Sequence, residues 1–453
     1  MSAPDESRLT LLGRLRRLLP TPRPASGRDL DAAIARAQVR VILDAFGRDG
    51  ARGAPSTGNR SPRDGADVHY LFRPRCALVR AEDFDRLVRF FDERPREFEG
   101  GPDRVAEPTP GLLLISLPRR TDRADDVLAT LDQIDRELGT GIATPDHILY
   151  VAVRSKFCPA TEPLIPDGRS ATVFPVPRTD AQVGAGVNIA VVDTGLWKQA
   201  VTSKKSPWMK GVVADQDDLE VIDPQAIHPY AGHGTFVSGV VKCLAPGARV
   251  EVEGALTKGG AVHESELVAQ LDQALKEEDH PALISISAGS HTRNGFALLS
   301  FEMLASTYGL DDGEQTLIIA AAGNDGSKEP FWPAAFPWVA AVGSVDRDAK
   351  VSDFSNHGPW VDVFARGRDL VNAFPTGRYT CYEPPNVGQV RTFEGLARWS
   401  GTSFSTPIVT GLVAARMSAT GESALTAFKA VVGAGTASND PKAGSAPTVG
   451  PLT

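Results

Sequence analysis

From residue 187 onwards, short apolar runs alternate with patterns typical of amphipathic helices. The runs are nearly continuous in valine, isoleucine, leucine and alanine: VNIAVVD, VEVEGAL, ALISISA, TLIIAAA and WVAAVGSVD. Strands that are apolar on both faces are typical of a parallel sheet covered by helices on both sides. The pattern therefore predicts an α/β fold with a mostly parallel, doubly wound sheet. Functional residues of such sheets lie at the carboxyl ends of strands.

Three polar residues stand where these strands end or these helices begin. Asp193 ends the run that starts at Val187, His233 opens a helix within Ala-Gly-His-Gly-Thr, and Ser403 follows a Gly-Thr turn at a helix start. A serine hydroxyl becomes a good nucleophile when an imidazole takes its proton and a carboxylate orients that imidazole. Taken singly, each residue also has a structural interpretation, as a turn cap, a packed histidine or a helix N-cap.

In this order, Asp, His and Ser resemble the catalytic residues of the subtilisin-like serine peptidases, peptidase family S8. The resemblance extends over about residues 185–420, including the segments Trp332–Pro337 and Phe354–Gly358. It implies that Ser403 attacks the scissile carbonyl, His233 is the general base and Asp193 orients His233. It also implies that Asn324, in Ala-Gly-Asn-Asp-Gly, donates its side-chain amide to the oxyanion.

The resemblance further assigns a substrate cleft, in which an extended peptide adds as another strand. The residues expected to line it are Ser287, Ala288, Gly289 and Gly323. Ala288 departs from the larger aliphatic residue common in the family. The expected reaction is hydrolysis of peptide bonds in extended polypeptides through an acyl-enzyme. The alternative is a non-catalytic module that uses a protease-like fold to bind peptides.

Residues 67–153 carry a second pattern, strand-helix-strand-helix-strand, which predicts a small α+β domain of the ferredoxin-like type. The predicted elements are VHYLFRPRCALV, EDFDRLVRFF, GLLLISLP, ADDVLATLDQIDREL and HILYVAV. The resemblance implies a propeptide-like domain that assists folding and plugs the cleft, acting as an intramolecular inhibitor or chaperone. A structural or partner-binding domain remains the alternative.

The remaining segments are expected to be peripheral. Residues 1–66 form a helical appendage, with helices at Leu9–Leu19 and Asp29–Phe46, followed by a Gly/Pro/Arg-rich linker. Residues 154–186 form an exposed connector, where any self-cleavage is expected. The catalytic domain is assigned to residues 187–432. The tail, residues 433–453, is expected to be loose because it is poor in large apolar residues.

Composition excludes several classes of function. The net charge of -8, from 48 basic and 56 acidic residues, argues against a nucleic-acid partner. No apolar run reaches the length of a membrane span, and arginines interrupt the only signal-like segment, so a cytoplasmic protein is expected. The four cysteines lie far apart, which favours free thiols.

No cofactor and no metal are expected. The acidic residues Asp215, Asp217, Asp218 and Glu220 invite comparison with a calcium loop or a site for a basic substrate. Their spacing matches no known ligand pattern, so a solvated acidic turn is the preferred interpretation.

Overall fold

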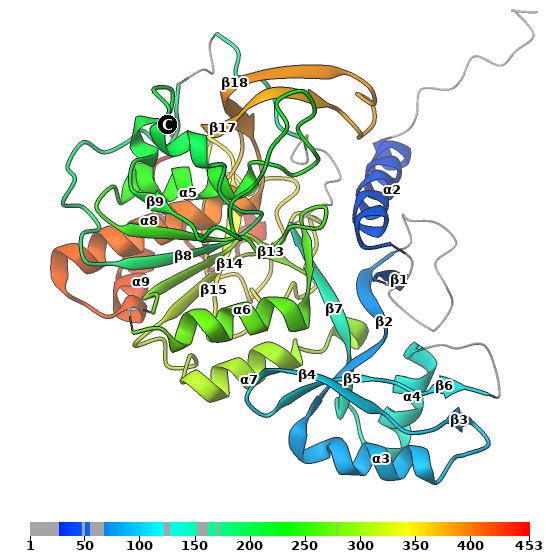
Figure 1. Cartoon of the computed structure of the whole chain (residues 1–453). Helices are drawn as coiled ribbons and strands as arrows, with labels where there is room; N and C mark the ends of the chain where they lie inside the picture. The colour runs from blue at the N-terminus through cyan, green and yellow to red at the C-terminus, as the bar shows by residue number, and fades with distance from the viewer. Residues whose placement is uncertain are drawn as a thin grey trace, which may run out of the picture.

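The computed structural model describes residues 27–47, 50–54, 68–121, 127–151, 162–168, 172–278 and 280–453, which form a large and a small lobe (Figure 1). The large lobe is built on a seven-stranded sheet in the order β16-β15-β14-β12-β8-β10-β9, and every neighbouring pair is parallel. Its strands are β8 (Asn188–Val192), β9 (Val212–Val213), β10 (Arg249–Glu253), β12 (Leu283–Ile286), β14 (Leu317–Ala321), β15 (Ala340–Val345) and β16 (Val363–Arg366).

Helices cover both faces of this sheet. They are α5 (His233–Leu244), α6 (Glu264–Lys276), α7 (Leu299–Tyr308), α8 (Thr402–Thr420) and α9 (Ala424–Gly433). Side chains of β8 alternate between two cores: Ile189 packs with residues of α5 and α8, whereas Ala190 packs with residues of α6 and α7. Burial of both strand faces explains why the sequence runs are apolar without alternation.

The small lobe has an antiparallel sheet in the order β7-β2-β5-β4, with helices α3 and α4 packed on one face around the same core. Its elements are β2 (Tyr70–Arg80), α3 (Phe84–Asp92), β3 (Phe98–Glu99), β4 (Asp103–Thr109), β5 (Leu112–Ser116), β6 (Arg119–Arg120), α4 (Val127–Leu138) and β7 (Ala143–Val151). Strand β4 was not predicted, because its sequence DRVAEPT is polar and its first five residues are exposed.

Strand β7 links the two lobes. It pairs antiparallel with β11 (Ala261–His263) and with β13 (Ala288–Gly289), both of which belong to the large lobe. The sheet of the small lobe therefore continues into the large lobe, and β7 lies between two of its segments (Figure 1).

Several peripheral segments differ from expectation. Helix α2 (Gly27–Phe46) is present, whereas the expected helix at 9–19 lies outside the described residues. The expected linker contains a strand, β1 (Arg52–Ala54), which pairs with β2. A hairpin of two long strands, β17 (Leu370–Thr380) and β18 (Val390–Trp399), was not predicted. Short 3₁₀ helices are η2 (Ala81–Asp83), η3 (Lys198–Thr202), η4 (Pro207–Met209), η5 (Arg293–Gly295) and η6 (Pro441–Ala443).

The expectation of a loose tail is wrong. Thr448 pairs with Thr436 and Phe364, and Val449 is buried in the core of the large lobe. The described part of the connector is also packed rather than wholly exposed, since Glu162 and Phe174 are buried. These segments are packed because the large lobe supplies the surface that they cover.

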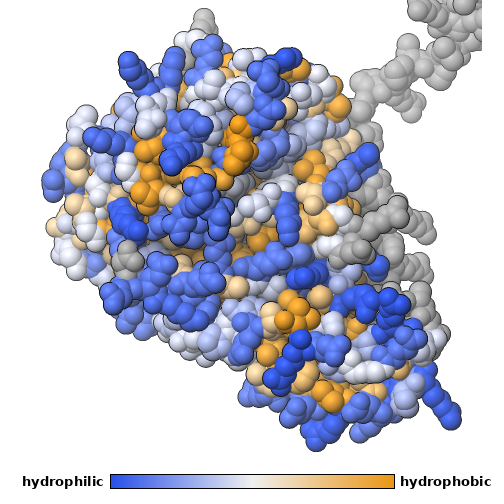
Figure 2. All heavy atoms as spheres, viewed as in Figure 1, coloured by the Kyte–Doolittle hydropathy of each residue, from blue (hydrophilic) through white to orange (hydrophobic). Residues whose placement is uncertain are grey.

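The visible surface is mostly hydrophilic, with apolar residues in scattered patches on both lobes (Figure 2). Within the described ranges, no helix combines the length and the apolar character needed to cross a membrane.

Candidate active site

The structure brings Asp193 and His233 into direct contact. Asp193 follows β8, and its Oδ1 accepts hydrogen bonds from His233 Nδ1 at 2.7 Å and from the Thr194 N–H at 2.8 Å. Both side chains are buried, and the His233 ring packs edge-on against Trp399. Because Oδ1 can only accept, His233 Nδ1 carries the proton of this bond. In the neutral ring, Nε2 is then the atom with a free lone pair.

The glycine after His233 allows this contact. A Cβ added to Gly234 would lie 2.5 Å from the Gly195 carbonyl oxygen and 3.1 Å from Asp193 Cβ. Only glycine lets the first turn of α5 approach the end of β8 so closely. The Gly234 N–H donates to Thr194 Oγ1, at 3.1 Å, which holds the two segments together. Packing thus requires the glycine of the His-Gly-Thr sequence.

Two residues of the acidic loop hold the backbone around this site. Glu220 Oε2 accepts from the Gly232 N–H at 2.7 Å, and Asp218 Oδ1 accepts from the Gly254 N–H at 2.7 Å. Burial raises the pKa of Glu220 well above its usual range, and the nearby Asp193 charge raises it further. The interpretation as a wholly solvated turn is wrong for Glu220, which is buried on its side-chain atoms.

Ser403 lies in the first turn of α8 and is only 2% exposed. Its Oγ donates to the Ser287 carbonyl oxygen at 3.3 Å, and Ser287 Oγ donates to the Ser403 carbonyl oxygen at 2.9 Å. Within the described part of the chain, Ser403 Oγ makes no hydrogen bond to His233. Serine-to-histidine bonds are often long in proteins without substrate and form when Oγ rotates.

Pro407 explains the second of these contacts. Pro407 is the sixth residue of α8 and therefore lies beyond its first turn. An ordinary residue there would donate its N–H to the carbonyl of Ser403, four residues earlier. Proline has no N–H, so the Ser403 carbonyl accepts from Ser287 Oγ instead. The proline therefore couples the start of α8 to the end of β12.

Asn324 follows β14 and faces the start of α8. Its Oδ1 accepts from the Thr402 N–H at 2.9 Å and from Thr402 Oγ1 at 3.0 Å. Because the Thr402 N–H is a donor, the atom facing it must be the oxygen, and this fixes the orientation of the amide. Nδ2 is then directed toward the turn before Ser403: a Cβ added to Gly401 would lie 3.4 Å from it.

The expected cleft residues surround this point. Ala288 and Gly289 form β13, and the Gly323 N–H donates to Thr402 Oγ1 at 3.2 Å. A Cβ on Gly289 would lie 2.4 Å from Phe331, so packing also requires a glycine there. Sequence reasoning assigned no role to Asn356, which accepts from the Asp325 and Ser327 N–H groups.

Strand β7 already occupies the pairing edge of these cleft residues. Val151 lies opposite Ala288 and Tyr150 lies opposite Gly289, while β11 pairs along the other side of β7. Hydrogen bonds to a buried carboxyl group join the two lobes. Asp146 Oδ1 and Oδ2 accept from the Ser265 N–H and hydroxyl at the start of α6, at 2.9 and 2.8 Å.

A family model described as "Subtilase family" matches residues 184–438, more than half of the chain. The chain belongs to the subtilase family. This subtilase is 30% identical over 242 residues to a thermophilic serine proteinase of Bacillus sp. (strain AK1), covering 51% of this chain and 52% of that protein. It is 28% identical to an intracellular serine protease of Paenibacillus polymyxa, covering 51% of this chain and 66% of that protein.

The alignments thus span about half to two thirds of the length of these relatives. Among solved structures, the prenylagaramide maturation protease PagA is 25% identical, with a TM-score of 0.44, covering 60% of this subtilase and 94% of that chain. The family match lies within the large lobe and the packed tail.

The three cysteines that the structure describes take no part in the contacts of the site. Cys76, Cys243 and Cys381 are free thiols, and Cys158 lies outside the described residues. Burial raises the pKa of Cys243 to about 12, and Asn372 contributes a hydrogen bond to its sulfur. A thiol with so high a pKa is unreactive at neutral pH, consistent with a role in packing.

Proposed function

We propose that the chain is a serine endopeptidase that hydrolyses peptide bonds through an acyl-enzyme. Ser403 attacks the scissile carbonyl, His233 takes the proton of Ser403 Oγ and returns it to the leaving amine, and Asp193 holds the His233 ring. The observation that carries the proposal is the 2.7 Å bond between buried Asp193 and His233, because it leaves Nε2 as the basic atom.

The oxyanion is proposed to bind at the start of α8. Asn324 contributes Nδ2, since its oxygen is held by Thr402. The Ser403 N–H contributes a second donor, because the first N–H groups of a helix have no partner within the helix. The positive end of the helix dipole favours negative charge at the same place.

We further propose that the small lobe is a ferredoxin-like, propeptide-like domain that holds the large lobe latent. Its support is the pairing of β7 with β13 and β11, which fills the edges that an extended substrate would use. Ser287, next to β13, is in contact with Ser403, so β7 leads toward the nucleophile. Self-cleavage is therefore proposed shortly after Val151. We accordingly assign residues 67–153 to an inhibitory domain and residues 187–432 to a catalytic domain.

An intracellular location also remains a proposal. The relative from Paenibacillus polymyxa is named as an intracellular protease, and this chain shares 28% identity with it.

The test compares the wild-type chain with Ser403→Ala. We expect the wild type to react with a serine-directed fluorophosphonate and to shorten, as seen by intact mass, while Ser403→Ala stays unlabelled and full length. A folded wild-type chain that never labels, even after the small lobe is removed, would favour the non-catalytic, peptide-binding alternative. A chain that labels but never shortens would remove self-cleavage from the proposal and keep the chemistry.

A further inference from the structure

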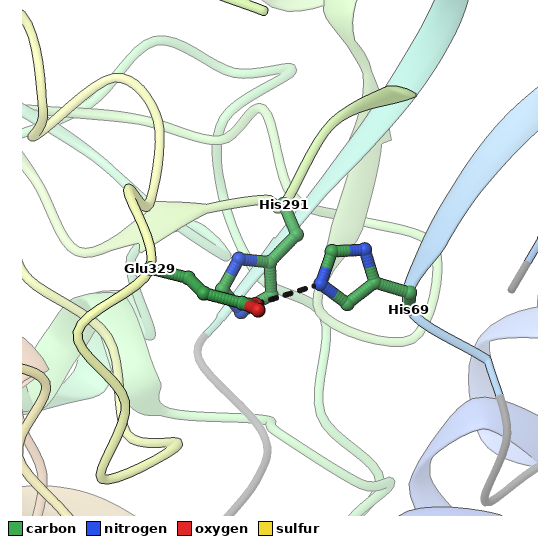
Figure 3. A group of neighbouring side chains, drawn as sticks. All are labelled: His69, His291 and Glu329. Carbon is green, nitrogen blue, oxygen red and sulfur yellow. Dashed lines mark hydrogen bonds and ion pairs between the residues drawn. The ribbon is translucent and has the colours of Figure 1, made fainter. Parts of the chain in front are cut away.

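A second group of polar side chains gathers where the two lobes meet (Figure 3). His69 comes just before β2 in the small lobe, whereas His291 follows β13 and Glu329 lies between β14 and β15 in the large lobe. One nitrogen of each ring and one carboxylate oxygen lie within 4.8 Å of one another. These residues take no part in the proposed peptide hydrolysis.

The hydrogen-bond partners of His291 favour a cation, either a proton or a metal ion, on its ring. Its Nδ1 lies 3.2 Å from the Pro330 carbonyl oxygen, and its Nε2 lies 3.2 Å from Asp325 Oδ2. Both partners can only accept, so a neutral ring that donates from Nδ1 would turn a lone pair toward a carboxylate. A proton or a metal ion on Nε2 removes this conflict. Metal-bound histidines commonly donate their other N–H to a backbone carbonyl in this way.

His69 lies against both of the other residues of the group. Its ring stacks on that of His291, with centroids 4.6 Å apart and an angle of 12° between the planes. His69 Nε2 lies 2.9 Å from Glu329 Oε2. A neutral imidazole beside a carboxylate is a common pair of metal ligands.

A small cavity adjoins the two rings. Its volume is 30 Å³, and its wall includes His69, His291 and Asp325 together with apolar side chains of α2. This is enough space for a single water molecule. A metal ion with three protein ligands usually completes its coordination with one water, and the cavity provides a place for it.

We propose that His69, His291 and Glu329 bind one divalent transition-metal ion of the zinc type across the interface between the lobes. Two imidazoles and one carboxylate are a ligand set that zinc accepts. Their 4.8 Å spread exceeds the separation of about 3.4 Å in a tetrahedral site, so binding requires the ligands to close around the ion. The Glu329 side chain is 61% exposed and can move toward the ion. The His69 ring must also turn out of its stack on His291, because an imidazole binds an ion in the plane of its ring. Because His69 belongs to the small lobe, the ion adds a tie between the lobes.

The test uses the full chain carrying Ser403→Ala, so that self-cleavage cannot separate the lobes. Calorimetric titration with zinc chloride is expected to give one ion per chain, and zinc is expected to raise the Tm by several degrees. Cobalt(II) is expected to give the strong visible absorption of a four-coordinate site. His69→Ala and Glu329→Gln should each weaken zinc binding at least 10-fold and abolish the shift in Tm. His280→Ala, which removes a histidine elsewhere in the large lobe, should change neither.

Absence of zinc binding by the parent chain would overturn the proposal. So would stoichiometric binding that both His69→Ala and Glu329→Gln leave unchanged, because the ion would then bind elsewhere. Circular dichroism checks that each variant is folded. If His69→Ala does not fold, Glu329→Gln decides the question, since an exposed carboxylate is a mild site for substitution.

Discussion

Asn324 performs two tasks that substitution can separate. Its oxygen accepts from the Thr402 N–H and hydroxyl at the start of α8, and its nitrogen is the proposed donor to the oxyanion. Asn324→Asp keeps an oxygen for Thr402 but replaces the donor with a second acceptor. Asn324→Ala removes both. Loss of one oxyanion donor costs about 3 to 4 kcal/mol, or about 100- to 1,000-fold in kcat.

The two variants should differ in stability. Asn324→Ala leaves two buried polar groups of Thr402 without an acceptor, which costs about 1 to 3 kcal/mol per unsatisfied group. For a domain of this size, each kcal/mol lowers the Tm by about 2 to 4 °C. We therefore expect a clear fall in Tm for Asn324→Ala and a smaller one for Asn324→Asp. Asn439→Ala, at an exposed asparagine, is the control and should match the wild type in both Tm and kcat/KM.

The assay measures kcat/KM for a fluorogenic peptide amide and the Tm of the same samples. Both variants should lose at least 100-fold in kcat/KM. A folded Asn324→Ala protein with kcat/KM within about threefold of wild type would refute the role of Asn324 as a donor. An equal loss of Tm in the two variants would refute the claim that the Asn324 oxygen stabilises the start of α8 by accepting from Thr402.

Three further changes test the site and its latency. Gly234→Ala should lower both the Tm and fluorophosphonate labelling, because the added Cβ would lie 2.5 Å from the Gly195 carbonyl oxygen. Gly433→Ala is the control and should change neither, because nothing lies within 4 Å of a Cβ at that position. Asp193→Asn should lower kcat by about 10,000-fold with little change in Tm, and near-normal turnover would contradict the triad. Burial raises the pKa of Asp146 from 3.8 to about 6 in the docked state, so the docked state binds the proton more tightly. The resulting stabilisation of the docked state is full below about pH 3.8 and is lost as pH rises through 6. In protein that carries Ser403→Ala, the Tm should therefore fall over this pH range, and Asp146→Asn should flatten that fall. A dependence of Tm on pH that Asp146→Asn leaves unchanged would contradict this assignment.

The sequence predicted the strands that are buried on both faces of the sheet and the helices that cover them. Strands of the large lobe such as β14 (LIIAA) are apolar throughout, and α6 has its apolar residues on one face. It did not predict β4, because an exposed strand with polar residues resembles a loop. The β17–β18 hairpin was missed because Pro375 and Gly377 interrupt the sequence of β17 and Gly395 interrupts that of β18. The packed tail was missed for a related reason: small residues such as Ala443 and Ala446 carry little signal until their partner surface is known.

The candidate site was visible in the sequence because its residues stand in short motifs with glycine neighbours. Asp193 and His233 do meet, and Asn324 does face the start of α8. The link from Pro407 through the Ser403 carbonyl to Ser287 could not be predicted, since it joins residues more than 100 positions apart. The proposed metal ligands were missed for the same reason. His69, His291 and Glu329 come from three separate segments, so no local spacing in the sequence indicates that they meet.

The position of β7 has a consequence for how such a chain would be switched on. If the small lobe inhibits as proposed, β7 is a tethered competitor of the substrate while the backbone is intact, and tethering can correspond to an effective concentration in the millimolar range. Dilution cannot displace it, and an incoming peptide must outcompete it at that concentration. Once the backbone is cut, the same strand becomes a separate ligand whose departure does depend on dilution. Latency would then be governed by the integrity of one peptide bond and by protein concentration, rather than by affinity alone.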